Sequence, residues 1–123
     1  MSRVAEKIRD RALAAEVPTI EDFPVAEWNA VVRIVGFSGA DLDAWDQMVA
    51  GRTADGRGLV GLRAELAVRV VRDPGTGDPI FTEEDIGPLS EGPQAPLDRI
   101  WTAASPIVGF GAGDEGGEAD EGK

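Results

Sequence analysis

The side chains of this 123-residue chain that could bind a metal ion or catalyse a reaction are almost all carboxylates. Glu83, Glu84 and Asp85 follow Thr82 directly, and hard divalent cations prefer carboxylate oxygens. A calcium loop, however, needs ligands that alternate over about twelve residues, whereas the turn at residues 73–78 offers only two carboxylates. The pattern favours a helix cap beside a tight turn, and we expect neither a metal ion nor a cofactor.

Residue types also argue against catalysis by other groups. The chain contains no His, no Cys and no Tyr, which removes the commonest general base, the thiol nucleophile and the nitrogen and sulfur metal ligands. Gly56, Gly58 and Gly61 lack the Gly-Lys-Ser/Thr ending of a nucleotide-binding loop, and we interpret them as part of a flexible linker. A binding protein is therefore expected rather than an enzyme.

The chain is strongly acidic, with 23 acidic and 12 basic side chains and a net charge of −11. Such a charge repels nucleic-acid phosphates and anionic lipids, so neither is an expected partner, although the acidity could also serve solubility alone. No apolar run approaches the roughly 20 residues that span a bilayer, and residues 1–7 turn charged too soon for a signal peptide. These features predict a cytoplasmic protein.

Apolar residues at helical spacing predict several helices that would position these groups. Ser2 and Ser38 suit the first position before a helix, Pro18 and Gly51 suit the ends, and Pro106 closes the last helix. The predicted helices cover residues 2–16, 38–51 and 61–72, a brief segment after Thr82, and residues 96–106.

One segment, residues 30–37, predicts a strand because it is short and dense in β-branched residues. Its partner strand is expected at residues 23–28. Together these elements predict an α+β fold that is mostly α-helical, with short helices packed on a small antiparallel sheet or hairpin. Residues 1–110 form a single globular domain in this prediction. Residues 111–123 have no large apolar side chain and predict a disordered acidic, Gly-rich tail.

Large apolar side chains on these elements are candidates for binding a partner. Tryptophan is enriched at binding hot spots, but Trp45 and Trp101 lie on the apolar faces of predicted helices, where core packing is the expectation. Trp28 lies near a turn and is equally compatible with either role. A surplus apolar helix face could accept another chain. The candidate partner-binding residues are Trp28, Leu42, Trp45, Leu66, Val70 and Trp101.

The order of these motifs closely resembles that of the tail assembly chaperones of long-tailed bacteriophages, the siphophages, over residues 25–110. No single motif is specific alone, whereas the ordered series of Asp73, the Gly-rich turn, residues 80–85 and residues 97–101 is moderately specific. The full set begins with Trp28 after a short acidic stretch, followed by a valine-rich strand whose last part is residues 33–39. An acidic segment that begins a helix follows at residues 40–45. The later motifs are residues 66–73, 79–86 and 97–104. Residues 105–110 depart from the family, which often continues here through a turn into another helix, and the loop at residues 52–58 is unusually Gly-rich.

The resemblance implies that the chain binds the phage tape measure protein, keeps it soluble and promotes polymerisation of the tail tube around it. It implies action in the host cytoplasm and absence from the mature virion. Such chaperones are commonly also made as a longer product by ribosomal frameshifting, with which Gly122-Lys123 is compatible. The tail tube protein and a second copy of the chain are further candidate partners. We expect holding without ATP, through an apolar face near Leu42, Trp45, Leu66 and Val70.

Two alternatives remain open from the sequence. The chain could be a minor structural protein of the tail or connector. It could also be an acidic mimic of DNA that inhibits a host nucleic-acid-binding protein, which would need carboxylates at phosphate-like spacing on a folded face. Five of the 23 carboxylates lie in residues 111–123 and others lie at helix caps, which disfavours the mimic.

Overall fold

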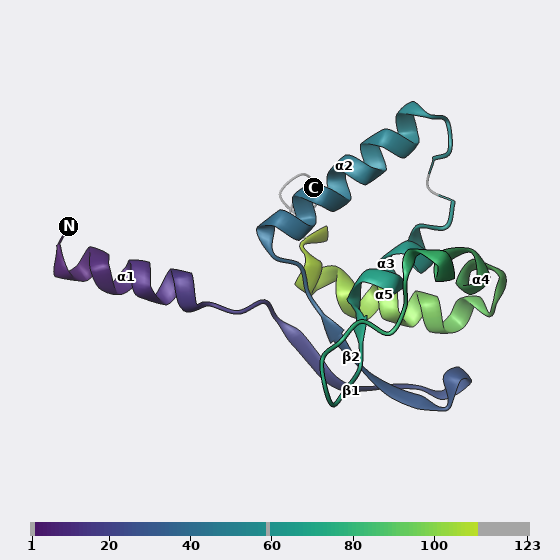
Figure 1. The fold of residues 1–123 in the computed structure, drawn as a ribbon, viewed down its shortest axis with the longest axis horizontal. Coiled ribbons are helices and arrows are strands. Elements are labelled where there is room, and N and C mark those ends of the chain that lie inside the picture. The colour runs from purple at the N-terminus through teal and green to yellow at the C-terminus, as the bar shows by residue number, and fades with distance from the viewer. Residues whose placement is uncertain (1, 59, 111–123) are drawn as a thin grey trace, which may run out of the picture.

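The structure is a computed structural model that describes residues 2–58 and 60–110. Helices pack on a small three-stranded antiparallel sheet, as the sequence predicts (Figure 1). In chain order the elements are α1 Arg3–Ala14, β1 Thr19–Val25, the 3-10 helix η1 Ala26–Trp28, β2 Ala30–Val35, α2 Gly39–Ala54, α3 Leu62–Val70, β3 Val71–Arg72, the 3-10 helix η2 Glu83–Asp85, α4 Ile86–Glu91 and α5 Gln94–Val108. The predicted acidic tail, residues 111–123, lies outside the described residues.

The strand β2 occupies the centre of the sheet, between β1 and β3. Its partner β1 runs from Thr19 to Val25, earlier than the predicted 23–28, because the later residues form the η1 turn. That turn closes at Asn29 with a φ of 52°, a left-handed conformation that Asn tolerates well. Pro24 fits within β1 because this strand lies at an edge of the sheet, where a missing amide hydrogen can face away from the ladder.

The core forms where α3 and α5 pack against one face of β2. Val32 and Ile34 alternate inward from β2, which is the period-2 pattern of a strand with one buried face. Leu66 and Val70 on α3 and Ile100 on α5 are fully buried against them. Burial of each such side chain contributes about 1.5–3 kcal/mol, so these central contacts dominate the stability of the fold.

Two of the predicted helices end too early. Helix α2 continues past Gly51 to Ala54 because the left-handed glycine that ends it is Gly56, with a φ of 81°. Helix α5 continues through Pro106 to Val108. There Val108 is 2% exposed and the Ile107 carbonyl accepts the Phe37 amide hydrogen at 3.3 Å, and these tertiary contacts offset the cost of the proline.

The predicted helix at residues 61–72 is too long, because its last two residues form β3. Val71 pairs with Ile34 and Arg72 pairs with Arg33, so β3 covers the second edge of β2. Val71 and Arg72 continue the apolar spacing of the helix before them. They adopt an extended conformation only because they pair with β2. Because Arg72 is extended and not helical, its side chain lies in a cleft opposite α2, as described below.

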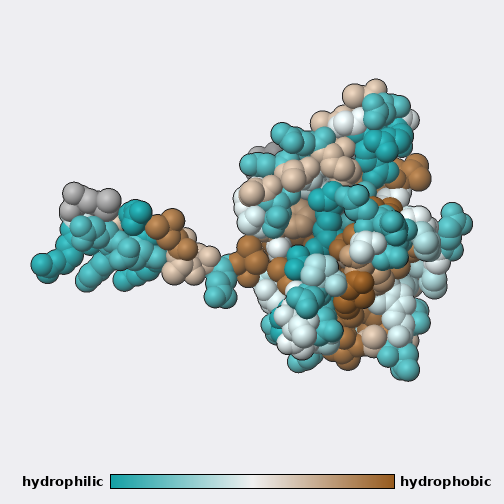
Figure 2. Space-filling model, viewed as in Figure 1, coloured by the Kyte–Doolittle hydropathy of each residue, from teal (hydrophilic) through white to brown (hydrophobic). Residues whose placement is uncertain are grey.

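Helix α1 stands away from the packed body (Figure 1). It begins as predicted, with the Ser2 hydroxyl accepting the Ala5 amide hydrogen at 3.0 Å. None of its residues is buried, so the core lies entirely in the residues that follow it. In Figure 2 this helix projects as a mostly hydrophilic rod that also carries apolar side chains. Across residues 2–58 and 60–110, no helix combines the length and apolar character needed to cross a membrane.

Candidate partner-binding sites

Four aromatic side chains gather at the junction of α2 and α5; we call Phe37, Trp45, Trp101 and Phe110 the aromatic cluster. The Phe110 ring centroid lies 5.3 Å from that of Trp45 and 5.2 Å from that of Trp101. Trp45 is 4% exposed and is the one buried residue of α2. The cluster is therefore the main anchor of α2 on the body, and the core role expected for Trp45 is confirmed.

Leu42 joins the same junction from the first turn of α2. Its Cδ2 atom packs over Gly109, which ends α5 in a left-handed conformation with a φ of 101°. Leu42 and Trp101 are both half-buried, so part of each remains accessible at this junction. Three of the six candidate residues, Leu42, Trp45 and Trp101, thus come together in space.

The other three candidates lie elsewhere. Leu66 and Val70 are completely buried between β2 and α5, and a partner cannot reach them without opening the core. Trp28 is half-buried and packs edge-on against Phe81, with ring centroids 5.6 Å apart. The single apolar face expected from Leu42, Trp45, Leu66 and Val70 is therefore not present on this surface, because helical periodicity marks core and binding faces alike.

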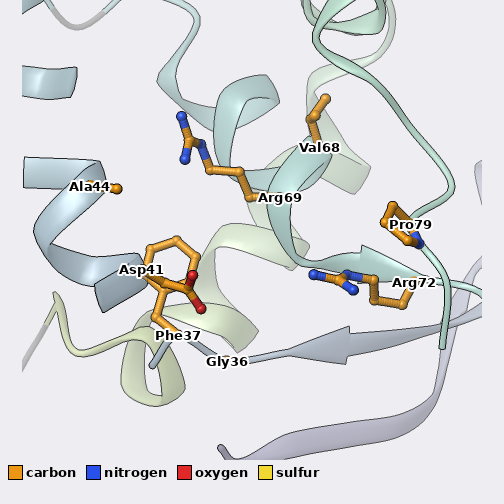
Figure 3. A pocket seen from close by; sticks show the side chains of 8 residues that line it. All are labelled: Gly36, Phe37, Asp41, Ala44, Val68, Arg69, Arg72 and Pro79. Atoms are coloured by element: carbon orange, nitrogen blue, oxygen red, sulfur yellow. The ribbon is translucent and has the colours of Figure 1, made fainter. Parts of the chain in front are cut away.

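A cleft of about 260 Å³ opens beside the aromatic cluster, between α2 and α3 (Figure 3). Arg69 from α3 and Arg72 from β3 both line it, and we call it the arginine cleft. In Figure 3 the two guanidinium groups point toward the α2 side, where Asp41 and Ala44 form the opposite wall. Its lining residues are Gly36, Phe37, Asp41, Ala44, Val68, Arg69, Arg72 and Pro79.

Arg69 is held in place by two contacts. Its Nη2 atom pairs with Glu65 at 3.1 Å, one helical turn earlier, and its guanidinium carbon lies 5.5 Å from the centre of the Trp45 ring. A cation over a tryptophan face contributes about 0.5–1 kcal/mol at an exposed site. The side chain is thus pre-positioned at the edge of the aromatic cluster.

Arg72 is less completely satisfied than Arg69. Its Nη1 atom donates to the Gly77 carbonyl at 3.3 Å, but it forms no ion pair with any residue in the described ranges. Its Nε atom is buried and finds no hydrogen-bond partner among those residues. An unsatisfied buried donor costs about 1–3 kcal/mol, but this Nε atom is too deeply buried for a ligand in the cleft to reach, so only the terminal guanidinium nitrogens of Arg72 are available to one.

Asp41 is the acidic group of the cleft, and a helix cap already uses its carboxylate. Its Oδ2 atom accepts the Ser38 amide hydrogen at 3.0 Å, and the Ser38 hydroxyl accepts the Asp41 amide hydrogen at 3.0 Å. The sequence predicts Ser38 as the cap of this helix, and the Asp41 side chain completes the cap with the return bond. The two arginines therefore face one carboxylate whose position is set by the backbone.

The turn at residues 73–78 supports the cleft from the side. Asp73 Oδ1 accepts amide hydrogens from Gly75 at 2.7 Å and from Thr76 at 2.9 Å, and these bonds hold the pKa of Asp73 below its ordinary value. The Asp73 and Asp78 backbones also bond to each other, which brings Pro79 to the cleft wall. The interpretation of this segment as a tight turn is confirmed.

The acidic run after Thr82 serves as a helix cap. Asp85 Oδ2 accepts the Thr82 amide hydrogen at 2.8 Å, at the start of η2. In the part of the chain that the structure describes, no three His, Cys, Asp or Glu side chains gather closely enough to hold a metal ion.

The second candidate surface is the apolar stripe of α1. Val4 and Ile8 lie one turn apart on one face and are 68% and 58% exposed. Leu13 is also exposed but lies roughly opposite, among charged residues, as the 3.6-residue period requires. Residues 1–15 carry four basic and two acidic side chains, so this region is +2 in a chain of net charge −11.

Sequence reasoning missed the arginine cleft. Arg69 and Arg72 are three residues apart in a run that predicts one continuous helix, where arginines are ordinary surface residues. Only the change to β3, the Trp45 ring and the turn before Pro79 bring them to one cavity. A local signal was available for one contact, since Glu65 precedes Arg69 by four residues.

Comparison with known proteins adds no relative. No protein-family model, no curated protein and no solved structure matches the chain.

Proposed function

We propose that the chain is a tail assembly chaperone, a non-catalytic protein that binds the tape measure protein and keeps it soluble until the tail tube forms around it. The observation that carries the proposal is the apolar stripe of α1, where Val4 and Ile8 are exposed on a helix with no buried residue. The ordered motifs in residues 25–110, which resemble this family, supply the identity of the client.

No residue of α1 is buried, which leaves this helix without support from the body of the protein. A 12-residue helix is only marginally stable alone in water, and its stripe gains nothing from the body of the protein. Burial of an aliphatic side chain against a partner contributes about 1.5–3 kcal/mol. Val4 and Ile8 are therefore suited to anchor α1 against a client helix that has an apolar face of its own.

Charge suits the same role. The basic α1 region would attract acidic client segments, whereas residues 16–110, with seven basic and sixteen acidic side chains, carry −9. A strongly negative body keeps complexes dispersed by mutual repulsion. Hydrophobic contact through α1 and repulsion between bodies together describe a holding chaperone that needs no nucleotide.

The test is co-purification with the tape measure protein that the proposal names as the client. We expect the tagged wild-type chain to retain the client. The double variant Val4→Ser/Ile8→Ser should retain at least tenfold less client, since removing two anchors costs more than 1.4 kcal/mol of binding free energy. Leu13→Ser is the matched control, because it removes an equally exposed aliphatic side chain from the other face of α1. Equal loss in both variants would contradict the role of the stripe.

A second measurement separates the chaperone from a structural tail protein. Mass spectrometry of purified virions should find the tail tube and tape measure proteins without this chain. Recovery of the chain in a fixed ratio to the tail proteins would instead assign it to the finished particle.

A further inference from the structure

The wall of the arginine cleft carries two arginines and one carboxylate, and the geometry around it indicates where a further acidic group can come from. Arg72 forms no ion pair with a described residue, and Arg69, which pairs with Glu65, is fixed over the Trp45 ring. The other wall supplies one carboxylate, Asp41, which is bound to the Ser38 backbone. Two positioned guanidinium groups beside aromatic rings suit an acidic peptide, because each can form charge-assisted hydrogen bonds with carboxylates.

The last described residue, Phe110, packs in the aromatic cluster beside this cleft. Phe110 packs on Trp45 with ring centroids 5.3 Å apart, and Trp45 in turn lies 5.5 Å from the Arg69 guanidinium carbon. The Phe110 ring and that guanidinium are thus separated by no more than 5.3 plus 5.5, or 10.8 Å. The Phe110 ring therefore lies near the cleft without lining it.

The residues that follow have the complementary charge and sufficient reach. Asp114, Glu115 and Glu118 are the first carboxylates after Phe110. Four residues of extended chain span at most about 13–14 Å, which is enough to bring the first of them from Phe110 to Arg69. The glycines at 116 and 117 place no side chain between the two acidic positions.

We propose that the acidic segment at residues 114–118 binds in the arginine cleft of its own chain, with carboxylates on Arg69 and Arg72. This inference does not depend on the chaperone function. The segment of the same chain is favoured over that of a second copy. A segment tethered a few residues away has an effective concentration in the millimolar range, whereas a second copy is present at micromolar concentration. An acidic ligand from another protein would then have to displace the segment before it could use the cleft.

Paramagnetic relaxation measures this contact in the full chain. The chain has no Cys, so a single Gly116→Cys carries one nitroxide label without interference. We expect selective broadening of the backbone amides of Gly36, Val68 and Arg69 at low salt, and its loss near 1 M salt, where the Debye length falls to about 3 Å. The same label at Ser90, an exposed residue of α4, is the positional control and should not give this pattern.

A charge variant tests the cause. In the labelled chain, Asp114→Asn/Glu115→Gln/Glu118→Gln should abolish the broadening, whereas Asp120→Asn/Glu121→Gln should leave most of it. These substitutions leave every residue of the hydrophobic core unchanged, so they keep the test valid if arginine variants fail to fold. Absence of broadening in the parent, or broadening that survives neutralisation of the first three carboxylates, would overturn the proposal.

A mixed sample identifies the occupant. Isotope-labelled chain without nitroxide is mixed with unlabelled chain that carries it, so only contacts between copies broaden the signals. We expect no cleft broadening in this mixture. Broadening of equal size in the mixture would overturn the intramolecular proposal in favour of a second copy.

Discussion

Gly36 packs so closely against the end of α5 that one added methyl group should destabilise the fold. A Cβ atom at Gly36 would lie 2.4 Å from the Ile107 carbonyl oxygen and 3.0 Å from the Pro18 carbonyl oxygen, whereas ordinary contacts begin at 3.4 Å. Both neighbours are backbone atoms, so no side-chain rotation relieves the clash. Gly36→Ala therefore requires α5 or the Pro18 segment to move by about 1 Å.

The expected size follows from two contributions. Overpacking a well-filled site costs about 1–3 kcal/mol. The movement also weakens the hydrogen bond from the Phe37 amide to the Ile107 carbonyl, which is worth about 1 kcal/mol. The free energy of unfolding should therefore fall by about 2–4 kcal/mol in Gly36→Ala, as measured by urea titration with tryptophan fluorescence.

Gly51→Ala is the matched control because it makes the same chemical change with the opposite expected sign. Gly51 lies inside α2, and an added Cβ would meet no atom within 4 Å. Alanine is the better helix former by about 0.5–1 kcal/mol, so this variant should hold or raise stability. A Gly36→Ala protein within 0.5 kcal/mol of the wild type would refute the reasoning about the α5 contact.

Two further outcomes test the core and the supporting turn. Leu66→Ala should lower the free energy of unfolding by about 2–5 kcal/mol because the side chain is completely buried, while Val4→Ala on the exposed α1 should change it by less than about 0.5 kcal/mol in the same urea titration. The folded-state pKa of Asp73 lies below the ordinary value of 3.8 because Thr76 and Gly75 donate hydrogen bonds to it. Its stabilising contribution is therefore complete above pH 3.8 and is lost as pH falls through the lower folded value, which carboxyl-carbon NMR of Asp73 during acid titration would detect. A titration midpoint at or above 3.8 would contradict this.

Local signals made much of the fold predictable. Ser2 and Ser38 cap helices where the sequence places them, because a capping side chain acts within one turn of backbone. The strand at residues 30–35 was recognisable from its run of β-branched residues. The α+β class followed from these elements together.

Tertiary contacts decided what the sequence did not predict. Val71 and Arg72 continue an apolar helical pattern, and they become a strand only because the edge of β2 is available beside them. Pro106 remains inside α5 because Val108 gains burial beyond it. The arginine cleft combines β3, α2, α3 and a turn, so no window of sequence contains it. Leu66 and Val70, in contrast, show that an apolar stripe alone does not separate core from binding surface.

The most direct test of the proposed function is the soluble fraction of the tape measure protein, produced alone and together with this chain. If the stripe of Val4 and Ile8 shields a client helix, the wild-type chain should move most of the client into the soluble fraction, and Val4→Ser/Ile8→Ser should not. A client that precipitates to the same extent with and without the chain would contradict the account.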